Sequence, residues 1–177
     1  MQFLRPSEVL PHRDPFLFLT EVTAYEIGEW AEGYWQLTGS EAFFSGHFPD
    51  RPTLPGVLLC ESIAQLGAYF VLQDQRFAGK LPLFGGIEKA RFRRQVVPGE
   101  RVDLRVEATR LSARAGKASG TATVDGEVAC SADLVFVVVE VRAQLSSFVM
   151  RVGQLRQSRY APRNQMNYST KDLGSRL

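Results

Sequence analysis

The stretch VLLCESIAQLGAYFVL, residues 57–72, decides the fold because almost every side chain in it is apolar. At about 1.5 Å per residue, this stretch makes a helix of roughly 24 Å. Pro55-Gly56 marks the start of the helix, and a helix without a polar face is usually enclosed on all sides. We therefore predict one central helix that lies buried under other elements.

The residues after this helix predict antiparallel strands. From Val102 to Ala108 every second residue is apolar and the residues between them are charged, which is typical of a strand with one buried face. Residues 118–124 and 127–139 predict two further strands. Asp125-Gly126, which joins them, is a strong signal for a two-residue hairpin.

The residues before the helix predict a helical turn over residues 6–10 and strands over residues 16–25 and 33–37. With the later strands, these segments make a long antiparallel sheet beside one buried helix. A sheet that curls around a single helix buries the apolar residues of both. We therefore predict an α+β chain with the hotdog fold over residues 1–140.

The size and charge of the chain limit its class. A chain of 177 residues holds one domain with a core of its own. Six of the 21 basic residues follow residue 145, against one acid, Asp172, so the formal charge of +2 comes from a basic extension, residues 141–177. It does not predict nucleic-acid binding. The two cysteines, Cys60 and Cys130, are too few for a disulfide framework or a metal site, and we expect both to be buried.

The N-terminal residues and the lengths of the apolar runs predict neither a signal peptide nor a membrane span. Charged residues and a proline interrupt the N-terminal residues where a signal peptide needs an unbroken apolar run. No run reaches the roughly 18 apolar residues of a membrane span, so we expect a soluble cytoplasmic protein. In the extension, a helical spacing of apolar residues predicts a short amphipathic helix before a flexible tail (Leu145, Phe148, Val149, Val152 and Leu155).

Two ionisable side chains stand apart from this apolar framework. Glu61 is the only charged residue in the helix, and Gln65 lies one turn later on the same face. A lone carboxylate there is costly unless it is paired, protonated or facing a cavity. His47 lies in residues 45–56, a loop that three prolines hold in a defined shape. Each group alone also fits a structural role.

The start of the helix separates these two groups in the sequence. Backbone N–H groups near Gly56 lack partners within the helix and carry partial positive charge. They are suited to hold a carbonyl oxygen on which negative charge develops. A base, an acid and such a donor are needed to abstract a proton next to a carbonyl and expel hydroxide. The combination predicts an active site of this kind.

Three blocks of sequence carry a resemblance to a known family. They are LPHRDPFL at residues 10–17, GHFPDRPTLPGV at residues 46–57 with Glu61 and Ala64-Gln65 behind it, and GIEKARFRRQVVPG at residues 86–99. In this order they resemble the β-hydroxyacyl-acyl carrier protein dehydratases of bacterial fatty acid synthesis. The likeness covers residues 8–140 and leaves the C-terminal extension outside it.

The resemblance implies a hotdog fold, and it implies a homodimer, or a trimer of such dimers, with the active site at the dimer interface. His47 of one subunit would take the α-proton of a (3R)-3-hydroxyacyl thioester carried on acyl carrier protein. Glu61 of the facing subunit would protonate the departing hydroxyl and leave a trans-2-enoyl product. A dehydratase-isomerase branch carries aspartate where this chain has Glu61, so the glutamate favours plain dehydration. No metal or organic cofactor is implied.

The same resemblance implies roles for the neighbours of this pair. The Gly56 amide would bind the thioester oxygen, and Gln65 would orient the acid. We expect Phe48 and Val57 to contact the substrate. His12 and Arg13 are expected to hold the N-terminal segment and to take no part in the chemistry.

The chain departs from the family just before the Gly86-Ile87 block. Relatives often carry a tyrosine there that gates the acyl tunnel, whereas this chain has Pro82, Leu83 and Phe84. We hypothesise that Leu83 or Phe84 closes the tunnel instead.

A basic cluster follows in the same region, formed by Lys89, Arg91, Arg93 and Arg94. Near the site entrance it would attract an acidic carrier protein by charge complementarity. A solvated strand face with no partner explains these residues equally well.

Two other functions remain open from the sequence. Hotdog thioesterases also place an acid on the central helix but activate water, and the Gly46-His47-Phe48-Pro49 loop argues against them. A non-catalytic hotdog subunit that binds acyl thioesters generally lacks the histidine or the acid. Both groups are present here.

Overall fold

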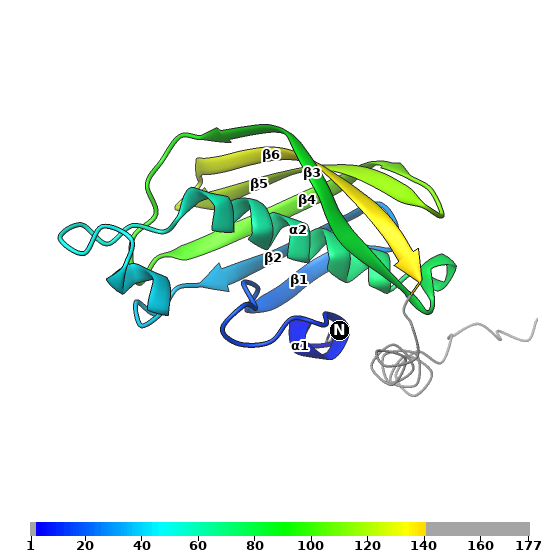
Figure 1. Cartoon of the computed structure of the whole chain (residues 1–177), viewed down its shortest axis with the longest axis horizontal. Coiled ribbons are helices and arrows are strands. Elements are labelled where there is room, and N and C mark those ends of the chain that lie inside the picture. The colour runs from blue at the N-terminus through cyan, green and yellow to red at the C-terminus, as the bar shows by residue number, and fades with distance from the viewer. Residues whose placement is uncertain (1–2, 141–177) are drawn as a thin grey trace, which may run out of the picture.

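The computed structural model describes residues 3–140, which form a six-stranded antiparallel sheet curved around one long helix (Figure 1). This is the hotdog fold, as predicted. In chain order the elements are α1 Pro6–Val9, β1 Glu21–Glu26, β2 Trp30–Gln36, η1 Ala42–Ser45, α2 Gly56–Leu72, η2 Gln75–Phe77, β3 Lys80–Phe92, β4 Arg101–Leu111, β5 Ala115–Val124 and β6 Glu127–Glu140. The predicted extension, residues 141–177, lies outside the described residues.

The sheet has the strand order β1-β2-β4-β5-β6-β3, so β1 and β3 are its edges. The hairpin between β5 and β6 turns at Asp125 and Gly126, whose φ angles of 52° and 81° are both positive. A type I′ turn requires positive φ at both central residues, and Asp-Gly is among the pairs that tolerate this. The sequence prediction of this hairpin is confirmed.

The first strand is shorter than predicted. β1 begins at Glu21 instead of residue 16 because the preceding backbone bonds to a side chain of α2. The Phe18 N–H donates to Oε1 of Gln65 at 2.8 Å, and the Phe16 carbonyl accepts from Nε2 of Gln65 at 3.1 Å. A buried glutamine therefore replaces a neighbouring strand as the partner of this segment.

Helix α2 lies across the concave face of the sheet and contacts every strand. Most of its side chains are buried, including Ile63, Leu66 and Phe70 at full burial. A stripe one turn apart, Val57, Glu61, Ala64 and Ala68, is only partly covered. The expectation of a helix enclosed on all sides therefore holds for most of its side chains and is wrong for the face that carries Glu61.

Two thiols meet where α2 packs on the sheet. Sγ of Cys60 on α2 lies 3.9 Å from Sγ of Cys130 on β6, and both cysteines are free and buried as predicted. The Cys60 thiol and burial together hold the pKa of the Cys130 thiol well above its ordinary range. The pair belongs to the core and fills it with small apolar groups.

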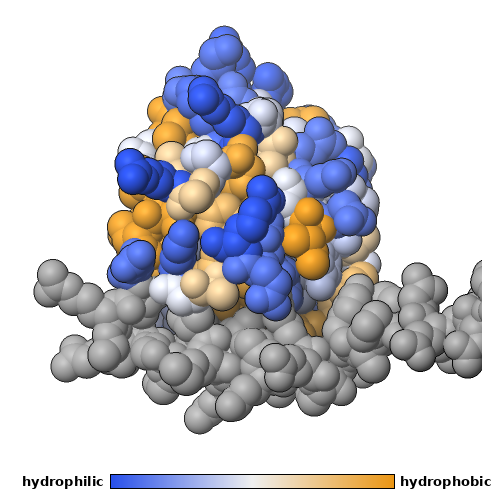
Figure 2. Space-filling model, turned by 90° about the vertical axis from the view of Figure 1, so that its right-hand side faces the viewer, coloured by the Kyte–Doolittle hydropathy of each residue, from blue (hydrophilic) through white to orange (hydrophobic). Residues whose placement is uncertain are grey.

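Edge strand β3 exposes large apolar side chains. Leu83, Phe84, Ile87 and Phe92 each leave more than two fifths of their surface exposed. At the end of the molecule seen in Figure 2, which is the right-hand end in Figure 1, hydrophobic side chains also reach the surface between hydrophilic ones. A long apolar edge strand is a site for pairing with another strand.

Within residues 3–140, no helix is long and apolar enough to cross a membrane. The cytoplasmic location stays a prediction.

Candidate active site

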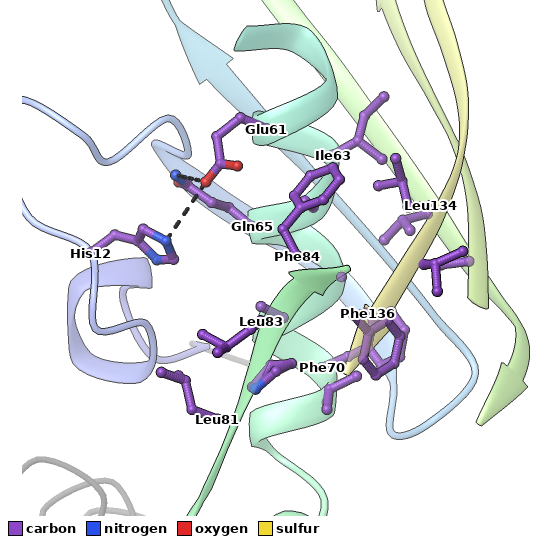
Figure 3. Close-up of a pocket in the computed structure, with 18 of the residues that line it drawn as sticks. His12, Glu61, Ile63, Gln65, Phe70, Leu81, Leu83, Phe84, Leu134 and Phe136 are labelled. Carbon is purple, nitrogen blue, oxygen red and sulfur yellow. Dashed lines mark hydrogen bonds and ion pairs between the residues drawn. The ribbon is translucent and has the colours of Figure 1, made fainter. Parts of the chain in front are cut away.

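A pocket of about 150 Å³ lies between α2 and the inner face of the sheet (Figure 3). Apolar side chains from α2, β3, β5 and β6 make most of its wall, among them Ile63, Phe70, Leu81, Leu83, Phe84, Ala118, Leu134 and Phe136. An engineered apolar cavity of about 150 Å³ stays dry and binds benzene. The pocket therefore has room for part of an apolar chain.

Glu61 brings the only carboxyl to this lining, counted over the described residues. Its side chain is about one fifth exposed, on the partly covered stripe of α2. Oε1 accepts a hydrogen bond of 2.9 Å from Nε2 of Gln65, the residue one turn later. The helical spacing seen in the sequence thus produces a direct contact.

The amide of Gln65 is held on three sides and is 1% exposed. Its Oε1 accepts from the Phe18 N–H, and its Nε2 donates to the Phe16 carbonyl and to Glu61. Both amide hydrogens are then used, so the orientation of the amide is fixed. Gln65 links the carboxyl of Glu61 to the N-terminal segment.

His12 is the second ionisable group in the pocket, and it was not predicted there from the sequence. Its Nε2 lies 3.6 Å from Oε1 of Glu61, as the dashed line in Figure 3 marks. Burial lowers the pKa of His12 from its ordinary value of 6.5, Glu61 opposes this, and Arg13 adds to it. The ring is therefore neutral at neutral pH.

The His47 ring has a hydrogen-bond partner that selects one tautomer of its neutral form. Its Nδ1 lies 2.7 Å from the carbonyl oxygen of Thr53. Because a carbonyl oxygen only accepts, Nδ1 carries a hydrogen, and in the neutral ring Nε2 then holds the free lone pair. The backbone N–H of His47 also donates to the Phe43 carbonyl at 2.8 Å, which fixes the loop. His47 does not line the Glu61 pocket within a single chain.

Three other predicted site residues lie outside this pocket in the single chain. The Phe48 side chain is 61% exposed on a residue with φ of 60°, and its ring lies 4.1 Å from that of His47. Val57 is 64% exposed, and Gly56 is the first residue of α2. A Cβ on Gly56 would lie 2.9 Å from Cδ1 of Phe92, so only glycine lets this ring cover the helix start.

Leu83 and Phe84 both line the pocket from β3, and each is 43% exposed. Figure 3 labels both on β3 among the other side chains that line the pocket. The hypothesis that one of them closes the tunnel is compatible with this position and stays a prediction.

The basic cluster does not share the face of the pocket. Lys89, Arg91 and Arg93 line a separate groove with Arg105 and Asp133. Neighbours along the strands alternate between sheet faces, and Val106 and Leu134 line the pocket, so this groove opens on the outer face. The single chain therefore separates this groove from the pocket, and the expected position of the cluster near the site entrance stays a prediction.

Arg94 differs from the other three members of the cluster. It pairs with Glu100 at 2.7 Å and with Glu127 at 3.3 Å, and only about one fifth of its side chain is exposed. The hydrogen bond from Arg94 lowers the pKa of Glu100. Arg94 thus has partners within its own chain.

Known dehydratases resemble this chain in sequence over most of its length. The family model described as a FabA-like domain matches residues 10–133. A 3-hydroxyacyl-[acyl-carrier-protein] dehydratase, FabZ, of Exiguobacterium sibiricum is 51% identical over 75% of this chain and 94% of its own length. FabZ of Clostridium botulinum strain Okra is 48% identical over 75% of this chain and 92% of its own length.

The chain belongs to the 3-hydroxyacyl-[acyl-carrier-protein] dehydratase family.

Solved structures agree with the dehydratase fold. A dehydratase heterocomplex from Xenorhabdus doucetiae superposes with a TM-score of 0.66 at 17% identity, covering 87% of this chain and 98% of that chain. A mutant thioesterase from Pseudomonas aeruginosa superposes with a TM-score of 0.56 at 18% identity, covering 71% and 84%. At such identities the likeness shows the fold alone.

For this dehydratase family member, the structure brings Glu61, Gln65 and Phe84 to one pocket and leaves His47 outside it. The contact of His12 with Glu61 had one signal in the sequence, the LPHRDPFL block that resembles the family. The distance between the two side chains depends on how residues 10–17 cross α2, and no periodicity in the sequence encodes that crossing.

Proposed function

We propose that this chain removes water from a (3R)-3-hydroxyacyl thioester on acyl carrier protein and forms the trans-2-enoyl thioester for fatty acid biosynthesis. The 51% identity to a FabZ dehydratase over 94% of that relative carries the proposal. A carboxyl at the mouth of an apolar pocket supports it, because the acyl chain and the acid then meet in one place.

His47 is the proposed base. The Cα–H bond of the substrate breaks, and its proton goes to Nε2 of His47. The lone pair of Nε2 is free for this because Nδ1–H donates to the Thr53 carbonyl. General base catalysis of this type contributes roughly 10² to 10⁴-fold.

Glu61 is the proposed acid. The electron pair of the broken C–H bond forms the Cα–Cβ double bond, the Cβ–O bond breaks, and the hydroxyl leaves as water with the proton of Glu61. The Gly56 amide at the start of α2 holds the thioester oxygen while negative charge develops on it. Proton return from His47 to Glu61 through solvent completes the cycle.

The site requires two chains in this proposal. His47 does not line the pocket of its own Glu61, whereas β3 offers an apolar edge beside that pocket. Pairing β3 with β3 of a second copy covers the exposed side chains and brings His47 of one subunit to Glu61 of the other. Further assembly into a trimer of dimers is compatible with this pairing.

A mixing experiment tests the shared site. His47→Gln and Glu61→Gln proteins, each inactive alone, are unfolded together and refolded as a mixture. Random pairing makes half of the dimers mixed, each with one intact site of two, so about one quarter of the wild-type activity returns. No recovery in mixtures that contain mixed dimers would place both groups in one chain.

Carrier protein docks, in this proposal, on Lys89, Arg91 and Arg93. Exposed cations attract an acidic partner at long range, and the attraction weakens with salt. Arg91→Glu should therefore raise KM for carrier-bound substrate and leave KM for the coenzyme A thioester unchanged. An equal effect on both thioesters would remove the groove from the proposal.

The activity itself is tested by incubating the purified chain with 3-hydroxyacyl-acyl carrier protein and following the absorbance of the conjugated enoyl thioester. Glu61→Gln keeps the shape and removes the acid, so we expect turnover to fall at least about 10²-fold. Glu26→Gln makes the same change on an exposed residue of β1 and serves as the control.

Three outcomes would overturn the proposal. Near-normal turnover of folded Glu61→Gln would remove the acid from the mechanism. Release of free thiol without enoyl absorbance would instead support the thioesterase alternative, and binding without any reaction would support a non-catalytic subunit.

A further inference from the structure

His12 faces the carboxyl of Glu61 from outside α2. Its Nε2 lies 3.6 Å from Oε1 of Glu61, which is slightly too long for a hydrogen bond. Such bonds are often long in a free enzyme and shorten when substrate binds. In Figure 3, Gln65 and His12 approach the same oxygen of Glu61 from two sides.

The segment around His12 is tied down at several points. Arg13 donates to the carbonyls of Leu10 and His12 at 2.8 and 2.6 Å. Gln65 holds the backbone at Phe16 and Phe18, and the Tyr69 hydroxyl donates to the Leu4 carbonyl at 2.8 Å. The imidazole is thus presented to Glu61 by a fixed backbone, and its own nitrogens are not needed as anchors.

The chemistry of the ring selects one tautomer. Nδ1 of His12 is buried and has no hydrogen-bond partner among residues 3–140. A hydrogen on Nδ1 would therefore be a buried donor without an acceptor, which costs free energy. A hydrogen on Nε2 points at a carboxylate oxygen, so the neutral ring carries it there.

We propose that His12 is a positioning residue for Glu61: its Nε2–H and the Gln65 amide hold Oε1, so that Oε2 is left to carry the proton to the leaving hydroxyl of the substrate. The inference rests on the proposed function for the identity of the proton acceptor. The holding of Glu61 is independent of it.

The groups that face Glu61 within the described chain are few. The N-terminal segment brings His12, with Arg13 behind it, and α2 brings the neutral Gln65. The lining residues of β3, β4, β5 and β6 are apolar. In the dimer, the partner subunit brings His47 by the proposal above. Removal of His12 therefore removes the one neutral ring donor beside the carboxyl.

Two variants separate positioning from anchoring. His12→Phe keeps a ring and removes both nitrogens, and His12→Gln keeps an N–H at the end of the side chain. A small misplacement of a catalytic group can cost about 10²-fold in rate. We expect kcat of His12→Phe to fall between roughly 10- and 10²-fold with little change in KM, and His12→Gln to recover most of it.

The pH profile gives a second readout. Glu61 must be protonated to act as the acid, so activity is lost as pH rises through the basic limb. A donor to Oε1 favours the charged carboxylate, and its removal favours the neutral acid. The basic limb of kcat should therefore move to higher pH in His12→Phe and return in His12→Gln.

The controls make each failure distinct. Tyr69→Phe loosens the same segment at Leu4 without touching the pocket. His12 would be a structural anchor if kcat of Tyr69→Phe and of His12→Gln fell as far as kcat of His12→Phe. The pH profile of kcat would then also stay where it is in the wild type. Carboxyl NMR titration of Glu61 in wild type and His12→Phe needs no substrate: an unmoved midpoint overturns the inference, whereas an inactive wild type overturns the dehydratase proposal alone.

Discussion

At the residue scale, two glycines on β5 shape the pocket wall because they carry no side chain. A Cβ on Gly116 would lie 2.2 Å from Cζ of Phe136, its cross-strand partner on β6. A Cβ on Gly120 would lie 2.3 Å from Cγ2 of Ile63 on α2. Because Phe136 and Ile63 both line the pocket, these glycines let two large side chains move back from its centre.

Gly116→Ala should therefore shorten the acyl chain that the pocket accepts. The added methyl pushes the Phe136 ring toward the cavity, and one methylene in an apolar pocket is worth about 1–3 kcal/mol in discrimination. We expect kcat/KM for the longest substrates to fall tenfold or more, about 1.4 kcal/mol, while short substrates keep their rates. A series of thioesters of increasing chain length measures this.

The double variant Gly116→Ala/Phe136→Leu is the control for that series. A smaller side chain at 136 removes the clash, so the long substrates should recover. A uniform loss over all chain lengths in Gly116→Ala would indicate damage to the sheet and not to the pocket.

Phe84 stands on the other side of the same pocket, and the opposite change applies to it. Phe84→Ala removes a large, 43% exposed ring from the wall, so longer or bulkier acyl chains should gain relative to short ones. An unchanged chain-length preference would contradict the hypothesis that Phe84 closes the tunnel and would favour Leu83.

At the element scale, β3 serves two purposes, since one part of it lines the pocket and the rest forms a free edge. Its apolar side chains have no cover in one chain, and thirteen residues is long for an unprotected edge strand. In the proposed dimer, this strand would link the acyl pocket to assembly.

Ile87→Arg tests this coupling. A charge in the middle of the edge should convert the proposed dimer into monomers and reduce turnover at least tenfold, because the proposed site needs both chains. Light scattering behind size-exclusion chromatography gives the assembly, and it also separates dimers from hexamers. Ile27→Arg, an equally exposed isoleucine at the turn between β1 and β2, is the matched control and should change neither. An active monomer of Ile87→Arg would refute the shared site.

At the scale of the whole molecule, stability should fall in acid in two stages. Burial lowers the pKa of His12 below 6.5, so between the two values the unfolded chain binds a proton that the folded chain does not. This contribution is present above pH 6.5 and is lost as pH falls below it. The Arg94 hydrogen bond lowers the pKa of Glu100 below 4.5, so its contribution is present above that pH and is lost further into acid.

Melting temperatures measured between about pH 7.5 and 3.5 check both stages. His12→Gln should flatten the first stage and leave the second unchanged. An identical slope in wild type and His12→Gln near pH 6 would contradict the assignment to His12.

The overall architecture was predictable because the patterns that encode it are local. The apolar run of residues 57–72 and the Asp125-Gly126 turn each select one backbone form. The site was predictable only in part. Glu61 and Gln65 meet within one helix, whereas the contact of His12 with Glu61 and the outward side of Lys89 and Arg91 depend on how distant segments cross. Neither the register of a strand nor the path of a loop over a helix produces a periodic pattern of residues in the sequence.

The buried thiols of Cys60 and Cys130 can report local opening between helix α2 and the sheet. Both lie at 1% exposure or less where the helix rests on the sheet, so a bulky maleimide dye can reach them only after that contact opens. The rate of labelling in native buffer then measures how often the helix lifts from the sheet, without any engineered probe. An acyl ligand in the pocket would contact both the helix and the sheet, so it should slow that labelling.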